Sequence, residues 1–154
     1  MGIENHRHSE RVWFYNIGLY GDNVDNLQVR GSYWKARTLS SIREMLHHGN
    51  TIIDVLKFDI EGGEFLIFHQ LIRSGMLSDI KVIVFELHLA QIMASNDRDM
   101  VLNCYRALKM AFEQNGFKLW RLHENEIMAE KHPDSPFRWV ELYWVNMKYI
   151  KQKN

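Results

Sequence analysis

The chain has 154 residues, which suits one domain and leaves little room for two. Its 19 basic and 19 acidic side chains cancel, so no overall charge favours a nucleic acid as partner. A single cysteine excludes an intrachain disulfide and a cysteine-cluster zinc site, and no apolar run is long enough to span a bilayer. Residues 1–10 are polar, and we expect no signal peptide there, which leaves the compartment undetermined.

Short apolar runs alternate with longer periodic ones along the chain. The runs predict strands, and a repeat of three to four residues predicts helices. The sequences of 52–60 and 81–89 are almost continuously apolar, which is typical of strands buried on both faces. In chain order we expect a strand at 11–19, a helix at 38–48, a strand at 52–60, a helix at 61–75, a strand at 81–89, a helix at 99–114, and strands at 117–122 and 139–146.

The alternation of strand and helix predicts an α/β fold with a largely parallel sheet. The loop at 123–138 has no helical period, so we expect the last two strands to form an antiparallel hairpin. In the helix at 38–48, Ser41 and Glu44 have the spacing of a capping box. We divide the chain into a polar segment at 1–10, a domain at 11–147 and a basic tail at 148–154.

Polar side chains gather at the carboxyl ends of three predicted strands. Ligands of open α/β sheets bind at this edge, and a carboxylate in a strand is costly unless it has a partner. The candidate site therefore consists of Asp59, Glu61, Glu86 and His88. The residues at the three strand ends are Asp59 and Glu61, Glu86 and His88, and His123 and Asn125.

Each candidate also has a purely structural interpretation. Asp59 could do no more than form an ion pair with Lys57, which shares its face of the strand. Glu61 and Glu64 could each be an acid of the first helical turn, favoured there by the helix dipole. Glu86 and His88 could simply pair with each other or with Lys57. The gathering of all four is more informative than any one of them.

The segment IDVLKFDIEGGEF at 53–65, followed by VFELHL at 84–89, resembles a known family. It is similar to the FkbM-type and methyltransferase-like-24 class of S-adenosylmethionine-dependent methyltransferases, in which a strand reads LK-[IM]-D-[IV]-EG-x-E. Further blocks follow in the family's order and extend the resemblance over about residues 11–147. They are FYNIGL, the helix entry at Trp34, Thr38 and Leu39, GFKLWRLHEN and ELYWVN.

The resemblance implies a Rossmann-like methyltransferase fold, of which this chain has the C-terminal half. Residues 11–19 would be the family's third strand, so the first two strands and the glycine-rich cofactor loop would be missing. One flank of the strand at 52–60 would then be an exposed apolar edge. Such an edge favours self-association.

The resemblance also implies transfer of a methyl group from S-adenosylmethionine to an oxygen of a small-molecule or glycan-like acceptor. Asp59 would orient or deprotonate the acceptor hydroxyl. Glu86 or His88 would be the general base, or would hold a divalent metal together with Asp59. Glu61 and Glu64 would shape the site at the start of their helix.

Two other functions stay open at this point. One is a pseudoenzyme, a non-catalytic binding module that has kept the acceptor half of the domain and lost the cofactor half. The other is a metal-dependent hydrolase built on Asp59, Glu61, Glu86 and His88, although no residue is marked as its nucleophile.

Overall fold

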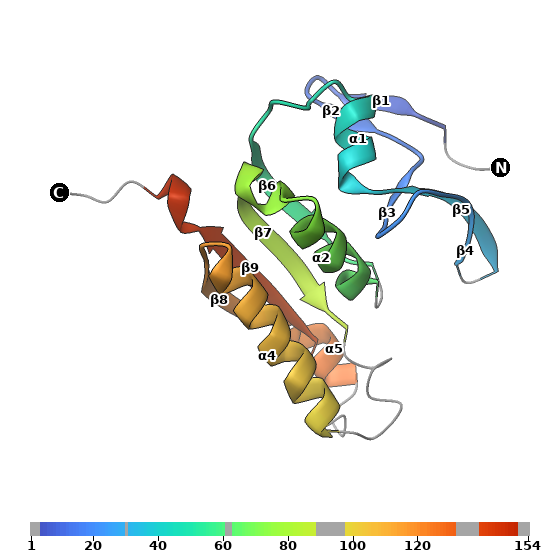
Figure 1. Ribbon diagram of the computed structural model, residues 1–154. Helices are drawn as coiled ribbons and strands as arrows, with labels where there is room; N and C mark the ends of the chain where they lie inside the picture. Colours follow the sequence, from blue (N-terminus) through green and yellow to red (C-terminus); the bar gives the residue numbers. More distant parts are fainter. Residues whose placement is uncertain (1–3, 30, 61–62, 89–97, 132–138, 151–154) are drawn as a thin grey trace.

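The computed structural model describes residues 4–29, 31–60, 63–88, 98–131 and 139–150 (Figure 1). The N-terminal quarter of the chain forms two small sheets. The rest forms a four-stranded sheet with two long helices on one face. In the described ranges, no helix combines the length and the apolar character that a membrane crossing requires.

The predicted strand at 11–19 is wrong. The chain turns at Ile17, whose N–H donates to the carbonyl of Tyr15 over 2.8 Å, and two short strands result. These are β2 (Val12–Phe14), which pairs with β1 (His6–Ser9), and β3 (Gly18–Leu19). β3 lies parallel to β5 (Ser32–Arg37), and β4 (Val24–Val29) pairs with β5 in the antiparallel sense.

The predicted helix at 38–48 is present but shorter, as α1 (Leu39–Met45). Its N-cap is Thr38, whose hydroxyl accepts a hydrogen bond from the Ser41 N–H, rather than the predicted pair Ser41 and Glu44. The helix ends early because His47 adopts a φ of 57°, which breaks the right-handed helical path.

The main sheet has the strand order β6-β7-β9-β8. β6 and β7 are parallel, whereas β7 with β9 and β8 with β9 are antiparallel. The expected antiparallel ending is therefore confirmed, but the expectation of a largely parallel sheet is wrong, because β9 inserts between β7 and β8. The four strands are β6 (Ile53–Phe58), β7 (Ile80–Leu87), β8 (Phe117–Glu124) and β9 (Val140–Asn146).

The core lies between this sheet and the helices α2 (Glu64–Arg73) and α4 (Arg98–Gln114), which cover the same face (Figure 1). A column of buried rings joins them. The centroid of Phe85 lies 4.6 Å from that of Phe68 and 6.1 Å from that of Phe112. The described residues also form three further short helices, namely η1 (Met76–Asp79), α5 (Glu126–Lys131) and η2 (Met147–Tyr149).

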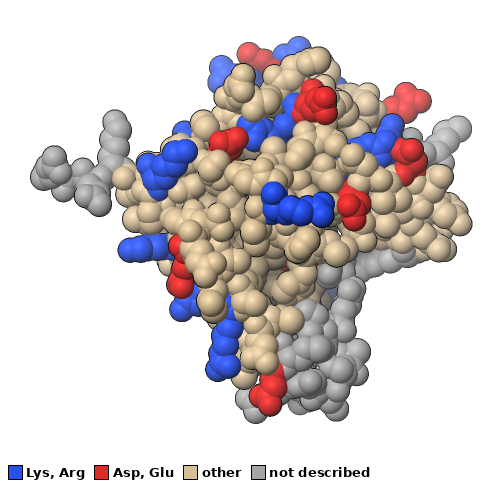
Figure 2. Space-filling model, viewed as in Figure 1, with Lys and Arg blue, Asp and Glu red and all other residues tan. Residues whose placement is uncertain are grey.

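β6 is not buried on both faces, contrary to the expectation for 52–60. It is the edge strand of its sheet, and Val55 is 58% exposed. Across the face seen in Figure 2, basic and acidic side chains are interspersed, so that face has no patch of one sign.

Candidate functional site

The carboxyl ends of β6, β7 and β8 meet at one edge of the main sheet. β6 and β7 are parallel neighbours, and β8 has the same direction because both β7 and β8 run antiparallel to β9. The predicted gathering of Asp59, Glu86 and His88 is therefore present. His123 and Asn125 line the same pocket as Asp59 and Glu86. The fourth predicted residue, Glu61, lies outside the described residues.

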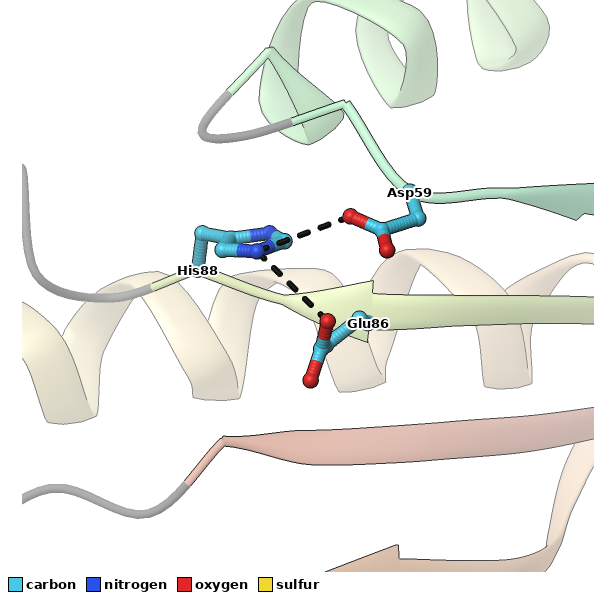
Figure 3. A group of neighbouring side chains, drawn as sticks. All are labelled: Asp59, Glu86 and His88. Carbon is cyan, nitrogen blue, oxygen red and sulfur yellow. Dashed lines mark ion pairs between the residues drawn. The ribbon is translucent and has the colours of Figure 1, made fainter. Parts of the chain in front are cut away.

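Asp59, Glu86 and His88 form a compact group (Figure 3). Nε2 of His88 lies 3.6 Å from Oδ1 of Asp59 and 3.6 Å from Oε2 of Glu86. The Asp59 side chain is 51% exposed, whereas those of Glu86 and His88 are 15% and 10% exposed. The group therefore opens to solvent on the side of Asp59.

His88 is oriented by Glu64, the first residue of α2. Its Nδ1 lies 2.8 Å from Oε1 of Glu64, whose side chain is fully buried. A carboxylate can only accept, so the proton lies on Nδ1 and the Nε2 atom faces Asp59 and Glu86. The bond to Glu64 raises the pKa of His88, against the opposing effect of burial. Glu64 is thus more than an acid of the first helical turn.

Glu86 is also held by a residue outside the group. The side-chain amide of Asn125 donates to Oε1 of Glu86 over 3.1 Å. This contact leaves Oε2 as the oxygen that faces His88. Asn125 follows directly after β8, so its position depends on the register of β8 with β9.

Lys57 does not pair with Asp59, which was the structural alternative for that residue. Its ammonium group lies 2.5 Å from Oε1 of Glu141 on β9. The contact raises the pKa of Lys57 and lowers that of Glu141. Sequence reasoning missed Glu141, although it stands directly opposite Glu86 in the sheet. The signal was a lone acid in an otherwise apolar strand.

A pocket of about 430 Å³ lies beside the group. Asp59 and Glu86 form part of its wall, and the start of α5 closes another part. The other lining residues are Lys57, His123, Asn125, Glu126, Ile127 and Glu141. All of its lining residues except Ile127 are therefore of polar type, with four carboxylates and one lysine.

The three ligand-type side chains could hold a metal ion, since their donor atoms all lie within 4.8 Å of one another. A glycine cradle for a nucleotide cofactor is not found among the described residues. Gly21 is needed for close packing, because a Cβ there would lie 2.8 Å from Cβ of Leu66 on α2. A Cβ on Gly18 would contact the ring of Trp34 at 3.6 Å. The glycines of this segment therefore face protein and do not fit that role.

Comparison with curated proteins finds two similar sequences, each described as a probable methyltransferase-like protein 24. The protein from Rattus norvegicus is 26% identical over 149 residues, and the one from Homo sapiens is 27% identical over 150 residues. Each alignment covers 92% of this chain but 40% of the relative. The chain thus spans less than half the length of the curated relatives it matches.

Among solved structures, the crystal structure of the M1.HpyAVI–SAM complex aligns with 90% of this chain and 59% of that chain. The TM-score is 0.43 and the sequence identity is 16%. The family comparison is decisive. The methyltransferase FkbM domain matches residues 28–119, more than half of the chain and a range that includes Asp59, Glu86 and His88. The chain belongs to the FkbM methyltransferase domain family.

Proposed function

We propose that this chain carries the acceptor site of an S-adenosylmethionine-dependent O-methyltransferase, in which Asp59, Glu86 and His88 bind and activate a hydroxyl group. The observation that supports this is the convergence of the three side chains at the carboxyl edge of the sheet, beside a pocket. A hydroxyl is a weak nucleophile until it loses its proton. A positioned group that takes up the proton commonly accelerates such a step by about 10²–10⁴-fold.

The lining of the pocket favours a neutral, hydroxyl-rich acceptor. Its four carboxylates accept hydrogen bonds from hydroxyl groups, and they repel anionic acceptors. Lys57 offers little compensation to an anion, because its ammonium group is already bonded to Glu141. A small glycan-like molecule would suit this wall.

S-adenosylmethionine is the methyl donor that the family implies. When bound, it would supply an activated methyl group for attack by the acceptor oxygen. We assign it no residue in this chain, because Gly18 and Gly21, the glycines next to β3, pack against protein. The roles proposed above belong to the acceptor side only.

The experiment is methyl transfer from labelled S-adenosylmethionine to a panel of neutral and anionic hydroxyl compounds by the full-length protein. Asp59→Asn keeps the shape and removes the charge, and we expect it to lower turnover by about 10²–10⁴-fold. Its melting temperature should change little, since Asp59 is half exposed.

The matched control is Asp54→Asn, because Asp54 lies on the same strand but is 80% exposed and pairs with Lys81. It should turn over like the wild type. If Asp59→Asn melts early and yet turns over normally per folded molecule, the activation role of Asp59 is wrong.

A pseudoenzyme is the second candidate, and the packing of Gly21 against Leu66 favours it. It predicts that the pocket binds a hydroxyl-rich ligand without methyl transfer. Binding by calorimetry, together with no labelled product from any acceptor, would support this candidate over the enzyme.

A further inference from the structure

We propose that Asp59, Glu86 and His88 form a binding site for one divalent transition-metal ion. Nε2 of His88 lies 3.6 Å from an oxygen of each carboxylate, which is longer than a hydrogen bond. Two ligands about 2.1 Å from one ion, at a tetrahedral or somewhat wider angle, lie about 3.4–3.6 Å apart. The two distances from His88 therefore suit ligands that share an ion, and all three donor atoms lie within 4.8 Å of one another.

Both of the more buried ligands are aimed by residues outside the group. The Nδ1–H of His88 donates to buried Glu64, which turns Nε2 toward the proposed position of the ion. The side-chain amide of Asn125 donates to Oε1 of Glu86, which turns Oε2 toward the same ion position. Metal-binding histidines usually donate their second ring N–H to a carboxylate or carbonyl in this way. Two independent outer contacts thus orient two ligand atoms.

The charge balance also favours a cation. Asp59, Glu64 and Glu86 surround a single imidazole, so the site is negative even when His88 is protonated. The nearest lysine, Lys57, has its ammonium group on Glu141. A doubly charged ion would offset this excess negative charge in a setting where two of the ligands are shielded from solvent.

The ligand types indicate which ion. One imidazole with two carboxylates suits Mn²⁺, Co²⁺ or Zn²⁺, whereas Ca²⁺ and Mg²⁺ prefer sites made of oxygen alone. Three protein ligands leave positions open, and the exposed side of the group faces the pocket. If the proposed function holds, an acceptor oxygen could take an open position and be polarised there.

The test is calorimetric titration of the full-length, tag-free protein with Mn²⁺ and Zn²⁺, together with absorption spectra of the Co²⁺ form. We expect one ion per chain, and a Co²⁺ spectrum of low coordination number. Asp59→Asn and Glu86→Gln should each weaken binding at least tenfold. Glu64→Gln, which removes the carboxylate that accepts from His88 and keeps every metal ligand, should weaken it by about 10–100-fold.

Two controls separate this site from incidental binding. Asp54→Asn removes an exposed acid from the same strand and should leave affinity unchanged. A His6→Gln, His8→Gln double variant removes neighbouring exposed histidines of β1 and should also leave it unchanged. Melting curves of every variant identify any that fail to fold. Because Asp59 is half exposed, Asp59→Asn is the ligand variant that we expect to disturb folding least.

The proposal is overturned if no ion binds at one per chain, or if Asp59→Asn and Glu86→Gln bind as tightly as the wild type. Loss of binding in the His6 and His8 variant alone would also overturn it. The titration needs neither methyl donor nor acceptor. A bound ion without methyl transfer would therefore refute the proposed function and leave the metal site intact.

Discussion

Arg43 joins α1 to the residues just before β6 and to Asp79, which is 36 residues away along the chain. It leaves α1 with a side chain that is almost fully buried, and its guanidinium donates to Asp79 over 2.9 Å at the end of η1. The same group donates to the carbonyls of Gly49 and Thr51 over 2.8 and 2.9 Å. Because Thr51 lies just before β6, these bonds fix the entry of the strand that carries Asp59 at its other end.

This contact predicts a pH dependence of stability. The guanidinium of Arg43 holds the pKa of Asp79 below its usual value. A carboxyl whose pKa is lower in the folded state stabilises the fold at pH values above its unfolded pKa of about 3.9. This contribution is lost as the pH falls through the lower, folded value. We expect Asp79→Asn to be less stable than the wild type at pH 7, by an amount that shrinks as the pH falls below about 4.

Urea unfolding at a series of pH values measures this difference. Asp54→Asn is the control, because it removes an exposed acid and leaves the Arg43 contacts in place. A constant gap between Asp79→Asn and the wild type at all pH values would contradict the prediction.

For single residues, the sequence predicted which side chains gather at the edge of the sheet better than it predicted the residues that bind them. Asp59, Glu86 and His88 follow from the rule that ligands bind at the carboxyl ends of strands. The role of Glu64 does not, because an acid in a first helical turn satisfies the helix dipole whether or not it reaches a histidine. Glu141 stands out in the sequence as a lone acid in an apolar strand, but its place opposite Glu86 follows only from the pairing of β7 with β9.

Among the elements, the contact between Gly21 and α2 links the N-terminal strands to the main sheet. Gly21→Ala would bring a Cβ within 2.8 Å of Cβ and 2.9 Å of the carbonyl oxygen of Leu66. Overpacking of this kind costs about 1–3 kcal/mol of unfolding free energy. We expect that loss in urea unfolding at pH 7.

Gly49→Ala provides the comparison, because a Cβ there meets nothing within 4 Å. It should be neutral or stabilise by up to about 1 kcal/mol, through the lower entropy of the unfolded chain. Equal effects of the two substitutions would show that α2 does not pack closely on this segment.

Helices and strands with many apolar residues were the ones that the sequence predicted correctly. The strands at 81–89 and 117–122 and the helix at 99–114 correspond to β7, β8 and α4, and each of these elements contributes apolar side chains to the core. β4 and β5 were missed, because their pairing with each other, rather than an apolar alternation, defines them as strands. The burial of β6 was overestimated, since an apolar run does not reveal whether both neighbours are present.

For the whole molecule, the open flank of β6 predicts self-association. Among the described residues β6 pairs with β7 alone, and Val55 is 58% exposed beside that flank. Unpaired edge strands add further strands, and lysine on an edge opposes this. We expect sedimentation velocity to show reversible association that increases with concentration, and Val55→Lys to shift the protein toward monomer.

Val12→Lys adds the same charge to an exposed valine of β2, outside the main sheet. It should associate like the wild type. If the wild type sediments as a monomer over the whole concentration series, the prediction of self-association through β6 is wrong.

The strand order also has a consequence for synthesis on the ribosome. Among the described strands β9 comes last along the chain, yet it lies inside the sheet, between β7 and β8. β9 is also the strand with which β8 pairs in the described ranges, so a nascent chain that stops before Val140 would hold two disconnected parts of one sheet. Glu141, which binds Lys57 beside the site, lies on β9 and is therefore synthesised late as well. The wall of the pocket is thus complete only when β9 has left the exit tunnel. Until then, the apolar faces of β7, β8 and α4 are covered only by packing against each other or by a chaperone.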